Sequence, residues 1–297
     1  LMADLAVLAT QTSFLQWRES LKGEPVMFVP TMGALHQGHV ELINAAKIWL
    51  KTHADSKGKI VVSIFVNPTQ FTDSQDFQNY PKTLEQDLEI CAQHGVDVIF
   101  APTPIEVYPE GIENVKLLDP GLKATGLESA TRPDHFAGVV TVLSRLFDLV
   151  QPDVAFFGEK DYQQLLVVTD FCRANYPDLL IHPVSTVREI DGIALSSRNR
   201  RLSITGRATA KHIPAAFALA EHALAEGHSI REVTEHVSNY LQSQPGLDLE
   251  YFAIRNADLT EVVEPRPGRI LLAVKIQNVR LIDNIAVELG DENVTRD

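Results

Sequence analysis

The sequence is poor in cysteine, in long apolar runs and in positive charge, and each shortage excludes a class of protein. The 2 cysteines of the 297-residue chain lie far apart in segments that read as helical, so no disulfide framework is expected. No apolar run approaches the ~18–20 residues of a membrane span. No basic segment followed by an apolar core begins the chain. We therefore expect a cytoplasmic protein without a membrane partner.

The charge balance is acidic, with 26 Lys and Arg against 39 Asp and Glu and a formal charge of −13. Such a chain lacks the basic surplus that binds a phosphate backbone, so no nucleic-acid partner is expected. Hydrophobic residues at 45% and charged residues at 22% are ordinary for a globular protein. A local basic pocket for a small anionic substrate is compatible with this composition.

Short apolar runs alternate with amphipathic stretches over the first two-thirds of the chain. The runs are β-branched or aromatic and several lack polar alternation, which is typical of strands covered on both faces. Residues 138–150, which lie between two of them, repeat apolar side chains at the helical period. The pattern predicts an α/β fold with a doubly wound, mostly parallel sheet. The predicted strands are residues 26–29, 60–66, 96–100, 154–157 and 179–187.

The last third has helical patterns first and short strand-like runs afterwards, separated by Gln244-Pro245-Gly246. This order predicts a smaller C-terminal α+β domain. We therefore expect two domains, residues 1–185 and 186–297. The helical patterns cover residues 205–227 and 230–241, and the strand-like runs cover residues 249–254, 270–276 and 279–282.

Polar clusters follow four of the predicted strands. In open α/β sheets, ligands bind outside the carboxyl ends of the strands, so we expect these amides, imidazoles and cations to face one region. The clusters are residues 30–39, 67–71 and 158–164, and Arg188 with residues 195–199.

The first cluster places a turn before a helix that starts near Gly38. A helix N-terminus suits a phosphate, because its N–H groups and dipole attract an anion. His36 and His39 lie three residues apart and share a face, and Gly38 permits close backbone approach. A metal site is disfavoured because no Cys or acidic third ligand lies at a familiar spacing. The alternative is a pair of ordinary surface histidines on a capping turn.

His-x-Gly-His after the first strand of a Rossmann-like sheet resembles the signature of the nucleotidylyltransferase superfamily. The chain resembles one family more closely, the pantothenate synthetases (pantoate–β-alanine ligases), from Gly23 to Asn284. The matching motifs are residues 30–39, 63–71 and 80–83, His135-Phe136 with Gly138-Val139, residues 158–164, Asp191-Gly192 with residues 195–199, and residues 280–284.

One loop departs from that family's pattern. Asp134 stands where Gly is expected, and residues 127–130 lack the glycine usual just before Arg132-Pro133. We expect both differences to affect the conformation of this loop.

The resemblance implies an AMP-forming ligase that condenses pantoate with β-alanine to give pantothenate, AMP and pyrophosphate through a pantoyl-adenylate. It implies ATP as co-substrate, Mg²⁺ and a homodimer. His39 would be the acid/base residue and His36 its partner on the phosphates. The remaining catalytic candidates, which would neutralise the pyrophosphate, are Lys160, Ser196, Ser197 and Arg198.

By the same resemblance, ATP would contact the two histidines and these four residues together with Pro30, Thr31, Met32, Gly33, Ala34, Leu35, Gly158, Glu159, Asp161, Val187 and Leu195. Pantoate and β-alanine would be bound by Gln70, Gln164, Asn67 and Met32, because amides match hydroxyls and a carboxylate without a fixed charge. Met32 and Phe71 either pack in the core or line the pocket for the pantoate methyl groups.

Asp87 and Asp161 are the candidate magnesium ligands, since Mg²⁺ keeps several waters and uses few protein carboxylates. Asp161 has two alternative roles, as a ligand of the adenosine or as a helix N-cap.

Two other functions compete with the ligase. A different nucleotidylyltransferase would need a cationic pocket for a second phosphate, where this chain offers Gln70 and Gln164. A nucleotide-binding regulatory module without turnover would not explain a carboxylate-substrate pocket beside the ATP motifs.

Overall fold

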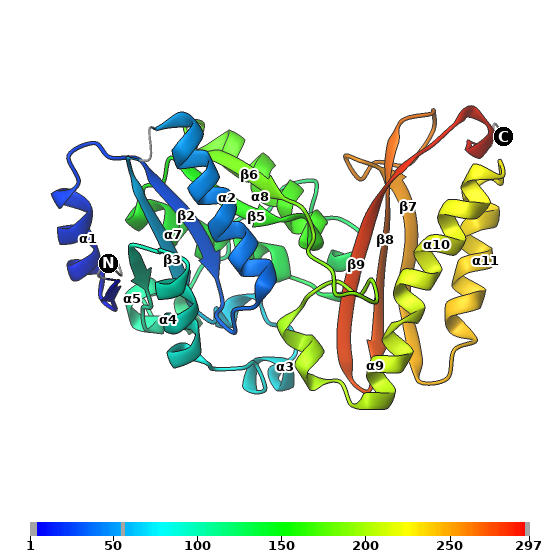
Figure 1. Cartoon of the computed structure of the whole chain (residues 1–297), viewed down its shortest axis with the longest axis horizontal. Coiled ribbons are helices and arrows are strands. Elements are labelled where there is room, and N and C mark those ends of the chain that lie inside the picture. The colour runs from blue at the N-terminus through cyan, green and yellow to red at the C-terminus, as the bar shows by residue number, and fades with distance from the viewer. Residues whose placement is uncertain (1–4, 55–56, 295–297) are drawn as a thin grey trace. The chain divides into compact units, whose positions relative to one another are not determined.

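The computed structural model describes residues 5–54 and 57–294 and divides into two compact units (Figure 1). One unit comprises the described residues up to Glu159 together with Gln164–Ser185. The other comprises Lys160–Gln163 together with the described residues from Thr186 onward. The second unit therefore takes four residues, Lys160–Gln163, from within the span of the first.

The first unit contains a parallel sheet of six strands in the order β1-β4-β3-β2-β5-β6, which confirms the predicted fold class. The sequence pattern misses β1, because a three-residue edge strand is too short to show a period. The strands are β1 (Ala6–Leu8), β2 (Val26–Thr31), β3 (Lys59–Ile64), β4 (Val98–Phe100), β5 (Val154–Gly158) and β6 (Leu180–Val184).

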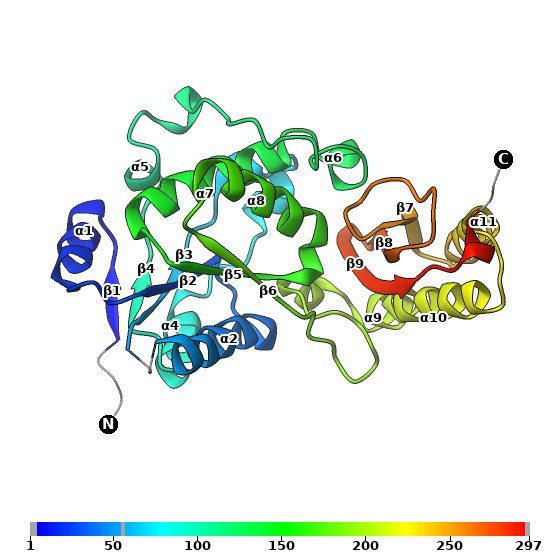
Figure 2. The ribbon, with the colours of Figure 1, turned by 90° about the horizontal axis from the view of Figure 1, so that it is seen from above.

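Helices cover both faces of this sheet, as Figure 2 shows, with α7 (His135–Val150) and α8 (Tyr162–Asn175) on one face and α2 (Gln37–His53) and α4 (Leu84–Gln93) on the other. Burial on both faces explains why the strands lack polar alternation. The shorter elements of this unit are α1 (Gln11–Ser20), η1 (Pro68–Gln70), α3 (Ser74–Gln78), α5 (Pro104–Val107), η2 (Ile112–Asn114) and α6 (Glu128–Thr131).

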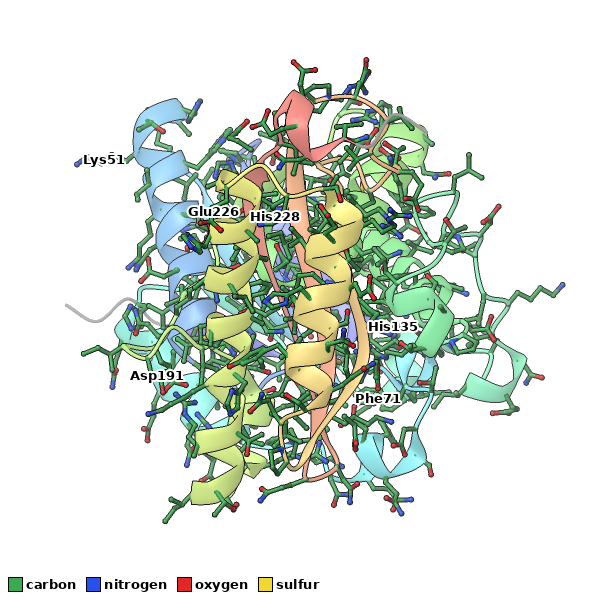
Figure 3. All side chains as sticks on the ribbon, turned by 90° about the vertical axis from the view of Figure 1, so that its right-hand side faces the viewer. Lys51, Phe71, His135, Asp191, Glu226 and His228 are labelled. Carbon is green, nitrogen blue, oxygen red and sulfur yellow. The ribbon has the colours of Figure 1, made fainter. Side chains whose placement is uncertain are left out.

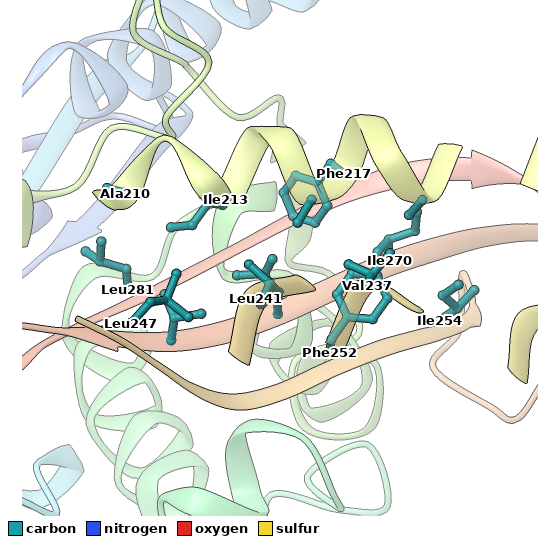
Figure 4. Close-up of a cluster of buried hydrophobic side chains, with 14 of the residues drawn as sticks. Ala210, Ile213, Phe217, Val237, Leu241, Leu247, Phe252, Ile254, Ile270 and Leu281 are labelled. Atoms are coloured by element: carbon teal, nitrogen blue, oxygen red, sulfur yellow. The ribbon is translucent and has the colours of Figure 1, made fainter. Parts of the chain in front are cut away.

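The second unit is an antiparallel sheet, β7-β8-β9, packed against two helices. Helix α11 (Ile230–Gln242) buries Val233, Val237 and Leu241, which recur every four residues on one face. Figure 4 shows Val237 and Leu241 in one buried cluster with Phe217 of α10 (His212–Ala225). The strands are β7 (Leu247–Asn256), β8 (Pro267–Ile276) and β9 (Val279–Glu288), and the remaining elements are η4 (Ser197–Arg201), α9 (Ile204–Ala210) and η5 (Asp291–Asn293).

The helix predicted over residues 205–227 is wrong as a single element, because it is interrupted at Lys211 between α9 and α10. Pro214 lies in the first turn of α10, where its missing N–H removes a bond that a continuous helix would need. The proline is therefore the physical reason for the break.

Side-chain contacts explain why Lys160–Gln163 belong to the second unit. The Asn284 amide donates to the Lys160 carbonyl at 2.9 Å, and the Tyr162 hydroxyl donates to the Ala257 carbonyl at 2.7 Å. The Arg269 guanidinium lies 3.8 Å from the centre of the Tyr162 ring. Lys160–Gln163, which span the end of η3 (Glu159–Asp161) and the start of α8, are thus held by β8, by β9 and by the residue that follows β7.

Both cysteines are buried thiols, which confirms that they form no disulfide with each other. Burial raises the pKa of Cys91 and of Cys172 to about 12, so neither forms a thiolate at neutral pH. Among the described residues, none of the helices combines the length and the apolar character that crossing a bilayer requires.

The loop before α7 explains the unexpected aspartate. Asp134 has φ +62°, a left-handed conformation that glycine adopts without strain and that aspartate tolerates better than most residues. Its side chain makes no capping hydrogen bond to α7. Leu127, earlier in the same loop, also has a positive φ of +47°.

Replacing Asp134 by Gly and by Ala should therefore change the free energy of unfolding in opposite directions. Asp134→Gly relieves the left-handed strain and should raise the free energy of unfolding by about 0.5–1 kcal/mol, after the extra flexibility of the unfolded chain is subtracted. Asp134→Ala keeps the strain without the polar side chain and should lower it by a similar amount. Urea unfolding of both variants measures the difference, and equal effects of Gly and Ala would contradict the strain argument.

Candidate functional site

The strand order reverses between β2 and β5, where the chain winds away in both directions. Ligands of doubly wound sheets bind at this point, outside the carboxyl ends of the two strands. Pro30 and Thr31 end β2, and Gly158 ends β5. The fold therefore brings the starts of two predicted ATP motifs to the topological switch point.

The turn after β2 is anchored to the neighbouring strand. The Thr31 hydroxyl donates to the Ser63 carbonyl of β3 at 2.7 Å and accepts from the Gly33 N–H at 3.1 Å. Gly33 and Ala34 then have φ values of +80° and +52°, so two successive residues are left-handed. This reversal leads through Leu35 to His36, the N-cap of α2.

His36 and His39 cap the helix reciprocally, and this relation explains their spacing. The His36 Nδ1 accepts from the Gly38 N–H at 3.1 Å, and the His39 Nδ1 accepts from the His36 N–H at 3.2 Å. Because both Nδ1 atoms are acceptors, each neutral ring carries its proton on Nε2. The rings lie 4.2 Å apart between their centroids. Both histidines therefore hold a fixed tautomer in which Nε2 is the donor.

Gly38 is required by the His36 ring. A Cβ at Gly38 would lie 2.8 Å from the His36 Cε1 and 3.0 Å from its Nδ1. The glycine that the sequence suggested for approach of a ligand thus has a role within the chain. It lets the first histidine fold over the start of the helix.

Gln70 is held in one amide orientation by Asn67. The Asn67 amide donates to the Gln70 Oε1 at 3.0 Å and to the Gly138 carbonyl at 3.2 Å, so the Gln70 Oε1 is an acceptor. The Gln70 Nε2 then lies 3.3 Å from the sulfur of Met32, within the turn that leads to His36. Gln70 is 8% exposed, and it joins the predicted pantoate residues to the predicted nucleotide turn.

Asn67 itself is fixed by Tyr108, a residue that the sequence does not single out. The Tyr108 hydroxyl donates to the Asn67 Oδ1 at 2.8 Å. Burial raises the pKa of Tyr108 to about 12, so the phenol stays protonated as a donor. Thr69 also donates its hydroxyl to the Asn67 Oδ1, at 3.0 Å. Asn67 therefore positions Gln70.

The start of α7 and the loop before it supply a second group of residues that the sequence analysis does not identify as part of the site. The His135 Nδ1 lies 2.8 Å from the Gln70 carbonyl, and the Arg132 guanidinium lies 3.1 Å from the His135 Nε2. Glu128 is 3.8 Å from Arg132. Figure 3 labels His135 and Phe71, which belong to the two packed segments α7 and η1 with its C-cap. The family motifs contain these residues, but only the fold shows their contact with Gln70.

The predicted residues of the second unit lie in two loops. Val187 and Leu195 are joined by a bond from the Leu195 N–H to the Val187 carbonyl at 2.9 Å. Ser196 caps η4, where its hydroxyl accepts from the Arg198 N–H at 3.2 Å, and Ser197 is buried beside it. Lys160 lies 3.7 Å from Asp161.

An ion-pair network supports the loop that carries Ser196 and Arg198. Arg207 binds Glu189 at 2.6 Å and Asp191 at 3.0 Å, and the Glu189 Oε1 accepts from the Asn199 amide at 3.3 Å. These contacts raise the pKa of Arg207, chiefly through its hydrogen bond with Glu189. The matching motif residues Asp191 and Asn199 therefore brace η4. Gln164, the other predicted pantoate residue, lies partly buried in the first turn of α8, in the first unit.

The structure does not support Asp87 as a magnesium ligand. Asp87 is 1% exposed, and its two oxygens accept from the Ala34 N–H at 2.9 Å and the Leu35 N–H at 2.7 Å. A hydrated Mg²⁺ ion needs space and octahedral access that this carboxylate lacks. Within residues 5–54 and 57–294, no three His, Cys, Asp or Glu side chains form a group that could hold a metal ion. The Asp161 role stays a prediction.

Comparison with known proteins identifies the family of the chain. The family model for pantoate-beta-alanine ligase matches residues 6–286, and the chain belongs to that family. A pantothenate synthetase of Nocardioides sp. is 45% identical over 273 residues, covering 91% of this chain and 80% of the relative. One from Aquifex aeolicus is 42% identical over 271 residues, covering 90% and 93%.

Two solved structures share the fold over nearly the whole length. The pantothenate synthetase of Thermus thermophilus has a TM-score of 0.84 at 38% identity, covering 97% of this chain and 99% of that one. The pantoate-beta-alanine ligase of Francisella tularensis, described as complexed with beta-gamma ATP and beta-alanine, has a TM-score of 0.79 at 35% identity with the same coverage.

The contact between α7 and η1 predicts that Gly138 cannot carry a side chain. A Cβ there would lie 2.8 Å from the Gln70 Cα and still closer to the Thr69 carbonyl, both backbone atoms. Gly138→Ala should therefore lower the free energy of unfolding by about 1–3 kcal/mol and displace Gln70.

Urea unfolding and the KM for pantoate test this prediction. Gly158→Ala is the matched stability control, because no described atom lies within 4 Å of a Cβ at Gly158. Equal stability of the two variants would show that α7 and η1 separate without cost.

Proposed function

We propose that the protein joins pantoate to β-alanine with the conversion of ATP to AMP and pyrophosphate. The observation that carries the proposal is the contact between Gln70 and Met32, because it links the paired amides of Asn67 and Gln70 to the turn that leads to the histidine pair. The family membership and the names of the relatives support the same reaction. The ATP and beta-alanine of the Francisella complex support these substrates.

The proposed reaction has two steps with a pantoyl-adenylate between them. A pantoate carboxylate oxygen bonds to the α-phosphorus of ATP, and the bond to the bridging oxygen breaks to release pyrophosphate. The amine of β-alanine then bonds to the acyl carbon and loses a proton, and AMP leaves. Because a carboxylate is a weak nucleophile facing a polyanion, alignment and charge neutralisation are the main tasks of the protein.

The histidines are proposed to serve the first step. His36 and His39 present Nε2–H donors from the start of α2, and a donor can stabilise charge on the bridging oxygen as pyrophosphate departs. Their fixed tautomers remove the need to reorganise during the reaction. Lys160, Ser196, Ser197 and Arg198 are proposed to bind the phosphates, with Lys160 as a point charge and Arg198 as a planar fork.

The pocket for pantoate is proposed to use Gln70 and Gln164. Since the Gln70 Oε1 is taken by Asn67, Gln70 offers an Nε2 donor to a substrate oxygen. Asn67 acts through Gln70, which refines its expected role. Met32 contributes an apolar surface suited to the pantoate methyl groups.

Magnesium is proposed to arrive with ATP and to be held by the phosphate oxygens and water. It would supply charge neutralisation on the phosphates, with Asp161 as the candidate carboxylate nearby in sequence to Lys160. A homodimer is proposed on the family resemblance, and a cytoplasmic location on the scarcity of cysteine and of long apolar runs. Light scattering of the purified protein and fractionation of cells measure these two properties.

The products distinguish this function from its competitors. We expect AMP and pyrophosphate only when ATP, Mg²⁺ and pantoate are all present, and pantothenate only after β-alanine is added. Release of ADP and phosphate would indicate attack on the γ-phosphorus. Nucleotide transfer to a phosphorylated acceptor would indicate a different nucleotidylyltransferase, and binding of ATP without any product would indicate a regulatory module.

Two substitutions separate the nucleotide from the pantoate contacts. His39→Ala should slow adenylate formation by ~10²–10³, measured by positional isotope exchange in ATP with pantoate, and leave supplied pantoyl-adenylate reacting with β-alanine. Intact isotope exchange in His39→Ala with lost amide formation would place His39 at the second step.

Gln164→Ala should raise the KM for pantoate far more than the KM for ATP, since buried polar groups of the ligand lose their partner.

A further inference from the structure

Asp87 connects α4 to the turn before the histidine pair. Its two carboxylate oxygens accept the backbone N–H groups of Ala34 and Leu35, at 2.9 and 2.7 Å, and both lie 3.3 Å from the Thr83 hydroxyl. Asp87 comes from a helix 53 residues further along the chain than Ala34. A carboxylate from one element therefore organises the backbone of another.

The turn has a conformation that needs such support. Gly33 and Ala34 are both left-handed, and for Ala34 this conformation is strained. It directs the N–H groups of Ala34 and Leu35 to one side, forming a concave anion site of the kind made by successive backbone amides. Here the anion is the Asp87 side chain. A Cβ at Gly33 would lie 3.0 Å from the Asp87 Oδ2, so the glycine also makes room for the carboxylate.

The position of His36 depends on this arrangement. Leu35 is fixed by its N–H bond to Asp87, and the next residue, His36, begins the reciprocal cap with His39. We infer that Asp87 is a positioning residue, which fixes the nucleotide turn through the Ala34 and Leu35 amides and thereby sets the two Nε2 donors. The inference rests on the proposed function for its kinetic consequence, whereas the structural consequence is independent of it.

The same geometry changes the roles of Ala34 and Leu35. Their N–H groups face Asp87, so an ATP phosphate does not take its hydrogen bonds from them while the turn keeps this form. These backbone bonds also distinguish two alternative functions of Asp87, as a metal ligand or as a positioning residue. A metal ligand would bind magnesium through its oxygens, whereas a positioning residue keeps those oxygens on the backbone.

Hydrogen exchange of the ligand-free protein tests the structural part. In Asp87→Asn one oxygen acceptor is lost, and the peptide covering residues 32–36 should exchange roughly ten- to one-hundred-fold faster, as expected for the loss of a charge-assisted bond. Residues 59–64 of β3 report global unfolding and should be unchanged. Asp97→Asn is the matched control, because the Asp97 carboxylate also accepts a backbone N–H, from Ile60 at 2.8 Å, so this variant should speed exchange within residues 59–64 and leave residues 32–36 unchanged. Unchanged exchange at residues 32–36 in Asp87→Asn would overturn the inference.

Steady-state kinetics test the functional part. Asp87→Asn should lower kcat/KM for ATP by roughly ten- to one-hundred-fold, with the same Mg²⁺ concentration at half-maximal rate as the unchanged protein. Thr83→Val keeps both backbone bonds to Asp87. It should therefore lower kcat/KM for ATP by less than about two- to five-fold, which is one-third of the Asp87→Asn effect on a logarithmic scale. A shift in the Mg²⁺ requirement with normal exchange of residues 32–36 would make Asp87 a metal ligand and refute positioning. Absence of ligase products from the unchanged protein would refute the proposed function and leave the exchange result standing.

Discussion

The parallel pairing of β2 with both β3 and β5 is the constraint on which the first unit depends. Met27 and Phe28 lie level with Val154 and Ala155 on one side, while residues from Val26 to Thr31 pair with β3 on the other. The segments that follow these strands must therefore leave from one edge of the sheet. The histidine turn and the Gln70 turn meet there, because each begins where its strand stops.

Apolar patterning was sufficient to predict this sheet, since buried parallel strands have a continuous hydrophobic signal of a few residues. It located β2 to β6 within a few residues of their observed bounds and failed only for β1, which has three residues. Apolar periodicity predicted the helices less completely. It does not reveal the break between α9 and α10, because that break is caused by the missing N–H of Pro214. The departure at Asp134 was visible in the sequence, but its left-handed φ required the structure.

In the candidate site, the residues that the sequence predicts are clearly separated from those that only the structure identifies. Residues in one motif, such as His36 and His39, could be paired from their spacing, although His36 is the N-cap of α2 and the two meet by reciprocal capping rather than on one helix face. Residues that support the motif come from far along the chain. Tyr108 is 41 residues from Asn67, and Asp87 is 52 residues from Leu35, so no local pattern links them. The residue type alone suggested a metal ligand at Asp87, whereas the bonded backbone amides indicate a structural anion.

The motif at residues 280–284 extends this reasoning to the second unit. Asp283 binds Arg188 through bonds of 2.6 and 2.9 Å, and Asn284 holds the Lys160 carbonyl. Burial raises the pKa of Asp283, and the Arg188 guanidinium opposes that rise, so the buried carboxylate depends on its partner. Removing one partner of such a pair typically costs about 3–5 kcal/mol, because the other charge is left uncompensated. Within this motif, Asn284 therefore holds the backbone that carries Lys160, and its neighbour Asp283 holds Arg188.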